Sequence, residues 1–417
     1  MSLQYTGLLI VAIAAFIAPV IAGLIPRRLV PPVVLEVLAG LAIGPQGLDL
    51  VHATGAVEVL YLIGFGFLLF LAGQEVEVER FRGPTFNLSG IAFLISLGLG
   101  FAVAVAIRPL ASGSDVRLLA LSLTASSLGV VVPLLRDAKE ISSEFGQLVV
   151  MAGSVGEFGS LLLLTILFSA QPEPTIVQIL YVVALGAAAV IGAVGIRWFW
   201  QTPWMRRVLL GSDESTSQLR VRGGFVILLI FSALAFQFGV DALLGAFVGG
   251  IVLSIADRDD RPNLERFQGK LRAIGYGFLV PVFFIVTGVT FDVRSLLASS
   301  SSLALLPVLV LAILAVRAAP ALIYRRRIGL APAAAAGLLQ ATTLTFPVVV
   351  AQVGLALGLL ARSTAAALVG AALLSVLLFP AIALALRPWT RLVPGGPAPD
   401  GPEPGGPAAA SGQAAAG

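Results

Sequence analysis

The segment Thr124-Ala-Ser-Ser-Leu-Gly-Val-Val-Val-Pro133 places a cluster of hydroxyl side chains, followed by a proline, inside an apolar run. A second segment of the same kind, Gln340-Ala-Thr-Thr-Leu-Thr-Phe-Pro347, lies in a later apolar run. A proline removes a hydrogen bond within a helix, and nearby Ser and Thr hydroxyls can satisfy the backbone groups that it frees. We therefore expect two interrupted helices, with broken-helix positions at Gly129, Pro133 and Pro347.

The composition of the whole chain indicates the environment of these two segments. Of the 417 residues, 58% are hydrophobic and only 12% are charged, and the mean hydropathy is +1.01. A soluble globular protein is usually about 25% charged. The apolar residues form runs of about 20, the length of a membrane-spanning helix, whereas an outer-membrane barrel would show alternating segments of about ten residues. The sequence therefore predicts an all-α polytopic membrane protein.

About thirteen membrane-spanning helices are expected along the chain. Their predicted residue ranges are 7–26, 29–44, 56–73, 86–107, 116–135, 147–170, 176–197, 221–238, 241–255, 273–290, 303–323, 332–360 and 363–386. The two hydroxyl-and-proline segments fall in the fifth and the twelfth of these spans.

The basic residues test this count of spans. With the N-terminus outside, 21 of the 26 Lys and Arg residues fall in the cytoplasmic loops and the C-terminal tail. Only Arg108, Arg117, Arg294 and Arg362 lie outside, and Arg317 lies within a span. This asymmetry follows the positive-inside rule, so we expect a cell (inner) membrane protein with a cytoplasmic C-terminus. The sequence pI of about 9.8 is then a result of topology, and no nucleic-acid partner is expected.

The two interrupted spans indicate an internal repeat. They are seven spans apart, and because seven is odd they run in opposite directions through the bilayer. Paired interrupted helices of opposite direction are typical of inverted-topology repeats in secondary transporters, whereas two unrelated proline-kinked helices would be the alternative. We expect a first repeat at 7–170, a linker helix and cytoplasmic loop at 171–220, a second repeat at 221–387, and a disordered Pro/Gly/Ala tail at 388–417.

Two charges lie in the middle of predicted spans. Glu157 is the only charge in the apolar run 147–170, and Arg317 stands in the middle of the run 303–321. A charge at the bilayer centre costs about 2.5–3.5 kcal/mol on insertion scales, so such residues are usually functional. Arginine keeps its proton in proteins, which makes Arg317 a fixed counter-charge and leaves Glu157 as the group that can exchange a proton. The chain has no cysteine and one histidine, which excludes disulfides and Cys/His metal sites.

Five segments, taken in order, resemble the monovalent cation/proton antiporters, and specifically the branch with the Kef-type and NapA-type sodium/hydrogen exchangers. These segments are Pro31-Pro-Val-Val-Leu-Glu-Val-Leu-Ala-Gly-Leu-Ala-Ile-Gly-Pro45, Leu68-Leu-Phe-Leu-Ala-Gly-Gln-Glu75, residues 121–137, residues 244–254 and Pro281-Val-Phe-Phe-Ile-Val-Thr-Gly288.

This resemblance implies a fold and a mechanism. The family fold has two inverted six-helix repeats joined by a linker helix, with crossed discontinuous helices, and it is divided into a dimerisation domain and a mobile core. The resemblance implies a homodimer and elevator-type alternating access. The family's ion-carrying acid lies on the sixth span and its partner cation on the eleventh, which are the spans of Glu157 and Arg317.

The chain departs from the electrogenic members of the family at two positions. Those members carry two adjacent acids on the sixth span and usually a lysine on the eleventh, whereas this chain has Gly156 before Glu157 and an arginine at 317. One titratable carrier predicts electroneutral exchange of one proton for one Na⁺ or K⁺. Hard cations prefer oxygen ligands, so hydroxyl groups are expected to complete the site around Glu157. The candidates are Thr124, Ser126, Ser127, Thr342 and Thr343.

The expected partners are the transported cation, the proton and the lipid bilayer, and neither a resident cofactor nor an enzymatic reaction is expected. Two other functions remain open: a sodium-coupled symporter of organic anions on a related fold, and a transport-inactive membrane scaffold. Glu36 is interpreted as structural or gating, and Glu75, at the end of a span, as interfacial.

Overall fold

A computed structural model describes residues 5–24, 31–75, 84–168, 175–205, 218–238, 242–256, 261–297 and 300–386. These residues form helices and connecting loops, with no strand among them, so the prediction of an all-helical protein is confirmed. The helices are α1 (Tyr5–Leu24), α2 (Pro32–Ile43), α3 (Ala56–Gln74), α4 (Pro84–Ile107), α5 (Val116–Ser122), α6 (Leu128–Asp137), α7 (Glu144–Leu167), α8 (Thr175–Gln201), α10 (Leu219–Gln237), α11 (Ala242–Ala256), α12 (Arg261–Ile274), the π-helix η3 (Gly275–Leu279), α13 (Val280–Val289), α14 (Val293–Leu297), α15 (Ser300–Ala321), the 3₁₀-helix η4 (Leu322–Tyr324), α16 (Arg325–Ile328), α17 (Leu330–Ala341), α18 (Thr345–Ala356) and α19 (Arg362–Ala385).

Ten helical segments in the described part of the chain are long and apolar enough to cross a membrane, and α2 and α11 are shorter apolar helices. The fold is thus that of a multi-pass membrane protein. Most of the predicted spans coincide with a single helix. The predicted spans 116–135 and 332–360 are each divided into two short helices, α5 with α6 and α17 with α18. Both predicted interruptions are therefore present.

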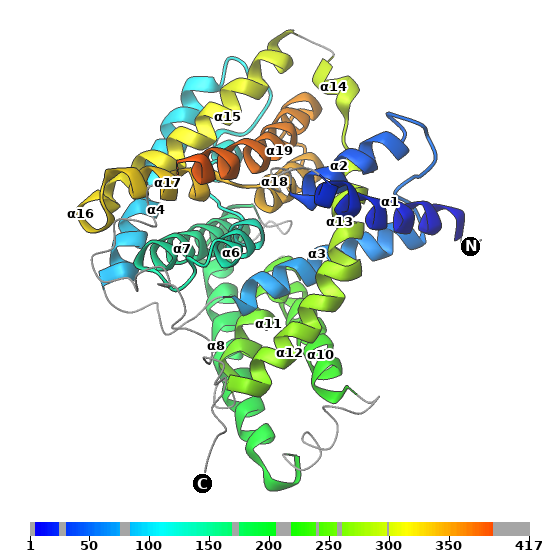
Figure 1. Ribbon diagram of the computed structural model, residues 1–417, viewed down its shortest axis with the longest axis vertical. Helices are drawn as coiled ribbons and strands as arrows, with labels where there is room; N and C mark the ends of the chain where they lie inside the picture. Colours follow the sequence, from blue (N-terminus) through cyan, green and yellow to red (C-terminus); the bar gives the residue numbers. More distant parts are fainter. Residues whose placement is uncertain are drawn as a thin grey trace, which may run out of the picture.

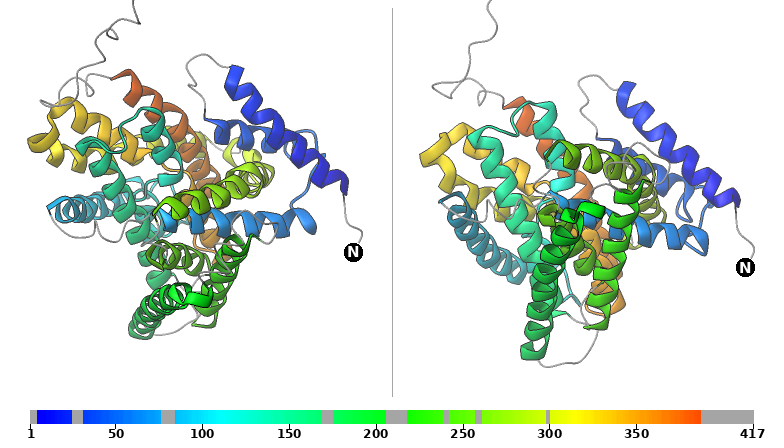
Figure 2. Two further views of the ribbon diagram at one scale, coloured as in Figure 1. Left: turned by 60° about the horizontal axis from the view of Figure 1, so that its bottom comes forward. Right: turned by 90° about the horizontal axis from the view of Figure 1, so that it is seen from below.

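The helices form two groups that differ in their packing partners. A scaffold group consists of α1, α2, α3, α8, α10, α11, α12, η3 and α13, and a crossing group consists of α4 to α7 and α14 to α19. Most of the packing between elements lies within these groups, and the boundary is formed by pairs such as α3 with α6 and α7 with α8. Figure 1 shows α1, α2 and α13 on one side of the molecule and α15, α16 and α17 on the other. Both further views keep them apart (Figure 2).

Glycines allow the closest helix contacts within the scaffold group. A β-carbon at Gly40 of α2 would stand 1.9 Å from the carbonyl oxygen of Ile285 in α13, and one at Gly288 would stand 2.0 Å from that of Val37. No side chain fits at either position, so the two backbones touch. Small residues at helix contacts are the usual means of tight packing in membranes, where burial of apolar side chains adds little.

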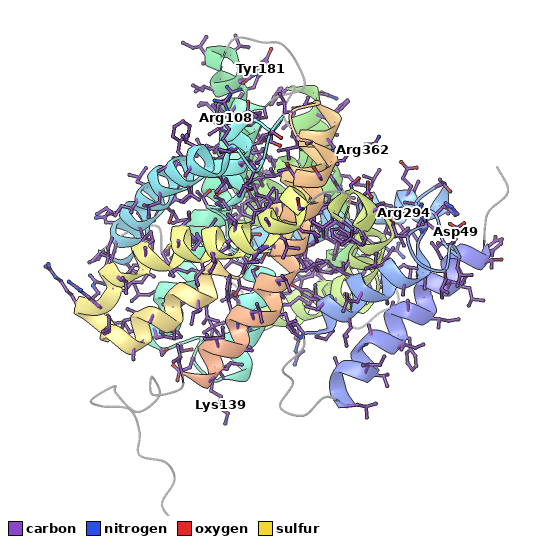
Figure 3. The ribbon with its side chains drawn as sticks, turned by 90° about the horizontal axis from the view of Figure 1, so that it is seen from above. Asp49, Arg108, Lys139, Tyr181, Arg294 and Arg362 are labelled. Atoms are coloured by element: carbon purple, nitrogen blue, oxygen red, sulfur yellow. The ribbon has the colours of Figure 1, made fainter. Side chains whose placement is uncertain are left out.

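Charged loop residues mark two opposite ends of the molecule. In Figure 3, Arg108, Arg294 and Arg362 lie toward one end, and Lys139 lies at the other. The first three are the residues that the charge pattern places outside, and Lys139 is one that it places in the cytoplasm. Which of these ends faces the cytoplasm stays a prediction.

Parts of the predicted domain division lie beyond the described residues. The tail at 388–417 lies wholly outside them, and of the predicted linker and loop at 171–220 the structure describes 175–205 and 218–220. Residues 175–201 form α8, the predicted linker helix.

Candidate functional site

The interruptions of the two broken helices lie against each other. Between α5 and α6 the backbone becomes extended at Ser127, whose N–H donates to the carbonyl of Thr342 at 2.9 Å. In the same place the Ser126 hydroxyl donates to the carbonyl of Gln340 at 2.6 Å. Each break thus supplies hydrogen bonds to the other, which removes the penalty of leaving polar backbone unpaired at membrane depth.

Ser127 also caps α18, the helix that follows the other break. Its hydroxyl oxygen accepts hydrogen bonds from the N–H groups of Leu344 at 2.8 Å and Thr345 at 3.3 Å, at the start of α18. A helix start leaves its first N–H groups without partners, and Ser127 serves as their cap from a distant segment. Ser375 of α19 serves the same break, because its hydroxyl accepts from the N–H of Thr343 at 3.1 Å and donates to the carbonyl of Thr343 at 2.8 Å.

Replacing Ser127 by alanine should destabilise the protein by about 2 kcal/mol, because two buried N–H groups of α18 lose their acceptor. The measurement is thermal unfolding in detergent. Ser142→Ala is the matched control, since Ser142 is exposed in the loop before α7. Equal unfolding temperatures for the two variants would show that the cap contributes nothing.

The broken helices run antiparallel. The N–H of Asp115, the residue that caps α5, donates to the carbonyl of Leu359 just after α18, at 2.8 Å. Helix α5 therefore begins where α18 ends. Asp115 also accepts hydrogen bonds from Arg117, and these bonds lower the pKa of Asp115.

The broken-helix positions predicted at Gly129, Pro133 and Pro347 are wrong. Gly129 and Pro133 lie inside α6 and Pro347 is the third residue of α18, whereas the breaks lie at 123–127 and 342–344. Pro347 is tolerated in the first turn of α18, because the N–H that a proline lacks would have no partner there. The chain is broken instead at the Ser and Thr clusters, where hydroxyls and the facing carbonyls supply hydrogen bonds.

Glu157 faces the start of α6. Its side chain is 4% exposed, and its Oε2 accepts a hydrogen bond from the N–H of Leu128, the first residue of α6, at 3.2 Å. The N-terminus of a helix carries a partial positive charge and free N–H groups, both of which favour a carboxylate. The first break therefore provides the polar environment that the isolated acid requires.

Ser160, which the sequence analysis missed, lies on the same face of α7 as Glu157. Its hydroxyl is 2.9 Å from the Thr124 hydroxyl, and Thr124 Oγ1 also donates to the carbonyl of Leu121 at 2.8 Å. Residues three apart on a helix are neighbours. The spacing between Glu157 and Ser160 could therefore have identified Ser160 from the sequence. This pair of hydroxyls lies at the same break as the carboxylate and has oxygen lone pairs for a cation.

Arg317 forms hydrogen bonds at both breaks. Its guanidinium group is 2% exposed, and its Nη2 donates to the Ser126 hydroxyl at 2.6 Å and to the carbonyl of Ala152 at 3.4 Å. Its Nε donates to the carbonyl of Gln340, near the end of α17, at 3.4 Å, and its Nη1 donates to the Ser96 hydroxyl at 3.5 Å. A cation is favoured near a helix C-terminus, where carbonyls lack partners and the dipole is negative.

Glu157 and Arg317 form no ion pair in the described part of the chain. The carboxylate faces the N-terminus of α6, and the guanidinium contacts the C-terminal turn of α17. Each charge therefore compensates a different helix end.

Gly156 explains how the arginine reaches this position. A β-carbon at residue 156 would stand 2.8 Å from Arg317 Nη2 and 3.2 Å from its Cζ. The guanidinium thus packs directly on the backbone of α7, in the space that a side chain at 156 would occupy.

Substituting alanine for Gly156 should destabilise the protein by about 1–3 kcal/mol, because the methyl group would displace the guanidinium from its acceptors. Gly186→Ala, on α8, is the control: no atom of the described residues lies within 4 Å of its β-carbon position, and alanine favours a helix over glycine by up to about 1 kcal/mol. Thermal unfolding of the two variants measures the difference, and a loss of stability in both would contradict the packing argument.

The remaining predicted ligands are engaged or lie apart from the carboxylate. The Thr342 hydroxyl donates to the carbonyl of Leu338 at 3.2 Å. The Thr343 hydroxyl is buried and has no hydrogen-bond partner among the described residues. Of the five predicted hydroxyls, Thr124 is the one that contacts the turn of α7 carrying Glu157, through its hydrogen bond with Ser160.

Comparisons with known proteins identify the family of the chain. The family model for the transmembrane part of sodium/hydrogen exchangers matches residues 11–385. The chain belongs to the sodium/hydrogen exchanger family. This membership confirms the resemblance drawn from the five sequence motifs.

Individual relatives are similar over most of the chain. YjbQ of Bacillus subtilis, named as a candidate Na⁺/H⁺ antiporter, is 28% identical over 90% of the chain, which spans 62% of the length of that protein. A protein named probable Na⁺/H⁺ antiporter 3 of Methanocaldococcus jannaschii is 25% identical over 91% of the chain and 96% of its own length. The solved structure of the sodium proton antiporter MjNhaP1 of M. jannaschii shares the fold with a TM-score of 0.63 at 16% identity, covering 90% of this chain and 95% of the other.

Proposed function

We propose that the protein is a secondary transporter that exchanges a monovalent cation, Na⁺ or K⁺, for a proton, with Glu157 as the shared site. The observation that carries this proposal is the enclosed carboxylate of Glu157 at the N-terminus of α6, beside the crossing of two broken helices. Membership of the sodium/hydrogen exchanger family supports the same reaction.

The exchange follows from the charge of one carboxylate. Protonated Glu157 is neutral and crosses without a cation, whereas ionised Glu157 crosses only with a cation bound. The bare carboxylate is retained by the cost of moving an uncompensated charge across the membrane. Oxygen ligands for the cation are supplied by Glu157, Thr124 and Ser160, and Ser126 and Ser127 hold the crossing in place.

The proposed stoichiometry is one proton for one cation. The position beside the carrier is a glycine whose free space is filled by the Arg317 guanidinium, and that arginine cannot release a proton under physiological conditions. Arg317 is therefore a fixed charge, and the exchange is electroneutral.

The proposed architecture has thirteen spans, with inverted repeats at 7–170 and 221–387 joined through 171–220. Antiparallel crossing of α5–α6 with α17–α18 supports the inversion. In an elevator mechanism the crossing group moves against the scaffold group, which belongs to the interface of a homodimer. We further propose an inner-membrane location with the N-terminus outside and the C-terminus in the cytoplasm, and a transport cycle without a resident cofactor.

The test is transport in proteoliposomes with an imposed pH gradient, to which Na⁺, K⁺ or Li⁺ is added in turn. At least one of these cations should dissipate the gradient. If none does, the protein is not a cation–proton antiporter. Recording membrane current in the same vesicles tests the stoichiometry, because a net current driven by the cation gradient would contradict one-for-one exchange.

The alternative of an organic-anion symporter lacks a basic group that could bind the anion. Within the described part of the crossing group, Arg317 is the basic residue at the breaks, and its hydrogen bonds are directed to Ser126, Ser96 and two carbonyls. Stimulation of sodium uptake by an organic anion in the same vesicles would favour that alternative.

A further inference from the structure

Tyr276 of the scaffold group lies beside the start of α6, the helix whose first N–H binds Glu157. Its hydroxyl is 3.6 Å from the position that a β-carbon of Gly129 would occupy, and Gly129 is the residue after Leu128. Because residue 129 is a glycine, it places no side chain of its own between the Tyr276 hydroxyl and the first turn of α6.

A local distortion of the backbone brings Tyr276 to this place. It lies in η3, a π-helical segment between α12 and α13. Gly275 lets η3 lie directly on α3, because a β-carbon there would stand 2.5 Å from Leu71 Cδ1 and 2.9 Å from Phe67 Cε1. Isolated π-helical turns are rare and often occur at functional sites.

The Tyr276 side chain packs against the apolar core of the molecule, and charges from both the scaffold and the crossing groups act on its hydroxyl. The charges that act on it are those of Glu75 at the end of α3, Glu157, Arg272 of α12 and Arg136 of α6. Glu75 has one carboxylate oxygen that is enclosed and has no hydrogen-bond partner among the described residues. The scaffold and crossing groups thus meet where the Tyr276 hydroxyl lies beside the first turn of α6, next to the proposed ion site.

The side of the membrane follows from the same residues. Arg136 and Arg272 belong to the set that the charge pattern assigns to the cytoplasm, and Lys139, three residues after Arg136, lies at the end of the molecule opposite Arg108 (Figure 3). The region between Tyr276 and α6 is therefore on the cytoplasmic side of Glu157.

We propose that the Tyr276 hydroxyl contacts the cation as it passes between the cytoplasm and Glu157, and thereby sets the affinity measured from the cytoplasmic side. A phenolic oxygen can act as an acceptor and suits a hard monovalent cation. Tyr276 belongs to the scaffold group and Glu157 to the crossing group, so the contact exists when the site faces inward and is lost when the crossing group moves. This inference rests on the proposed antiport function.

The test uses Tyr276→Phe, which removes the hydroxyl and keeps the ring, in inverted and right-side-out membrane vesicles. Losing one such contact is worth about 0.5–1.5 kcal/mol, which corresponds to an increase of about 2–10-fold in the half-maximal cation concentration. We expect that increase from the cytoplasmic side and a change of less than about twofold from the other. A merely structural role would change both sides together.

A second variant and a control complete the test. Gly129→Ala adds a methyl group 3.6 Å from the Tyr276 hydroxyl and should also raise the half-maximal concentration from the cytoplasmic side alone. Tyr181→Phe on α8, at the end of the molecule marked by Arg108 in Figure 3, should change neither side.

Each outcome decides between the proposals. If the parent exchanges cations but Tyr276→Phe and Gly129→Ala match it from both sides, this inference is wrong and the antiport function stands. If Tyr276→Phe does not fold, Gly129→Ala alone decides. If the parent exchanges no cation, both the inference and the proposed function fail.

Discussion

Replacing Glu157 by glutamine should abolish cation–proton exchange while leaving the protein folded. Glutamine has the same shape, and its amide oxygen can still accept the hydrogen bond from the N–H of Leu128. It cannot release a proton or neutralise a cation. A cation without its counter-charge would face a cost of about 2.5–3.5 kcal/mol, so exchange should fall by about 100-fold or more. The measurement is dissipation of a pH gradient in proteoliposomes.

Glu144→Gln is the matched control, because Glu144 lies on the same helix but is exposed in its first turn. It should exchange cations at the parental rate. The unfolding temperature of Glu157→Gln in detergent should match that of the parent, which separates loss of function from loss of structure. If Glu157→Gln transports like the parent, the site has been assigned to the wrong residue, even if the protein is an antiporter.

Replacing Arg317 by methionine should destabilise the protein more than any other single change considered. The substitution removes the donor to Ser126 and to the carbonyls of Ala152 and Gln340. A hydrogen bond to a charged group is worth about 1.5–3 kcal/mol, so the loss of these bonds should cost about 3–5 kcal/mol in total. For a chain of 417 residues, such a loss lowers the unfolding temperature by about 3–6 °C.

Two further variants separate charge from geometry. Arg317→Lys keeps the charge but lacks the planar fork that reaches several acceptors at once, so its unfolding temperature should lie between those of the parent and Arg317→Met. Arg326→Met removes an exposed arginine on α16 and should have little effect. If Arg317→Met unfolds at the parental temperature, the arginine does not hold the break together.

The interruptions of the two broken helices could be predicted from sequence, but their positions could not. Hydroxyl clusters and prolines in apolar runs indicate where a membrane helix can be broken, because these residues satisfy or lack backbone hydrogen bonds locally. The break itself falls where partners are available, and those partners are distant. Ser127 caps α18 from more than 200 residues away along the chain. The local patterns therefore predicted each break a few residues C-terminal to its position in the structure.

The candidate site could be predicted only in part, because some of its residues are distinguished by contacts with distant segments. Glu157 and Arg317 were identifiable because an isolated charge in an apolar run is costly wherever the helix packs. Ser160 was missed because serine is common in membrane helices, and only its contact with Thr124 at 2.9 Å distinguishes it. The roles of Ser126 and Ser127 could not be assigned without the structure, since a hydroxyl can cap a helix or bind an ion equally well.

The sequence by itself determined that this chain spans a membrane, where its two interrupted helices occur, and which acid and which base lie at membrane depth. These are consequences of hydropathy and charge, which act through each residue's own transfer between water and lipid. Only the tertiary structure decided that Glu157 and Arg317 serve opposite helix ends and that Gly156 makes room for the arginine. Those facts depend on hydrogen bonds and contacts between segments far apart in the chain, whose geometry no local pattern specifies.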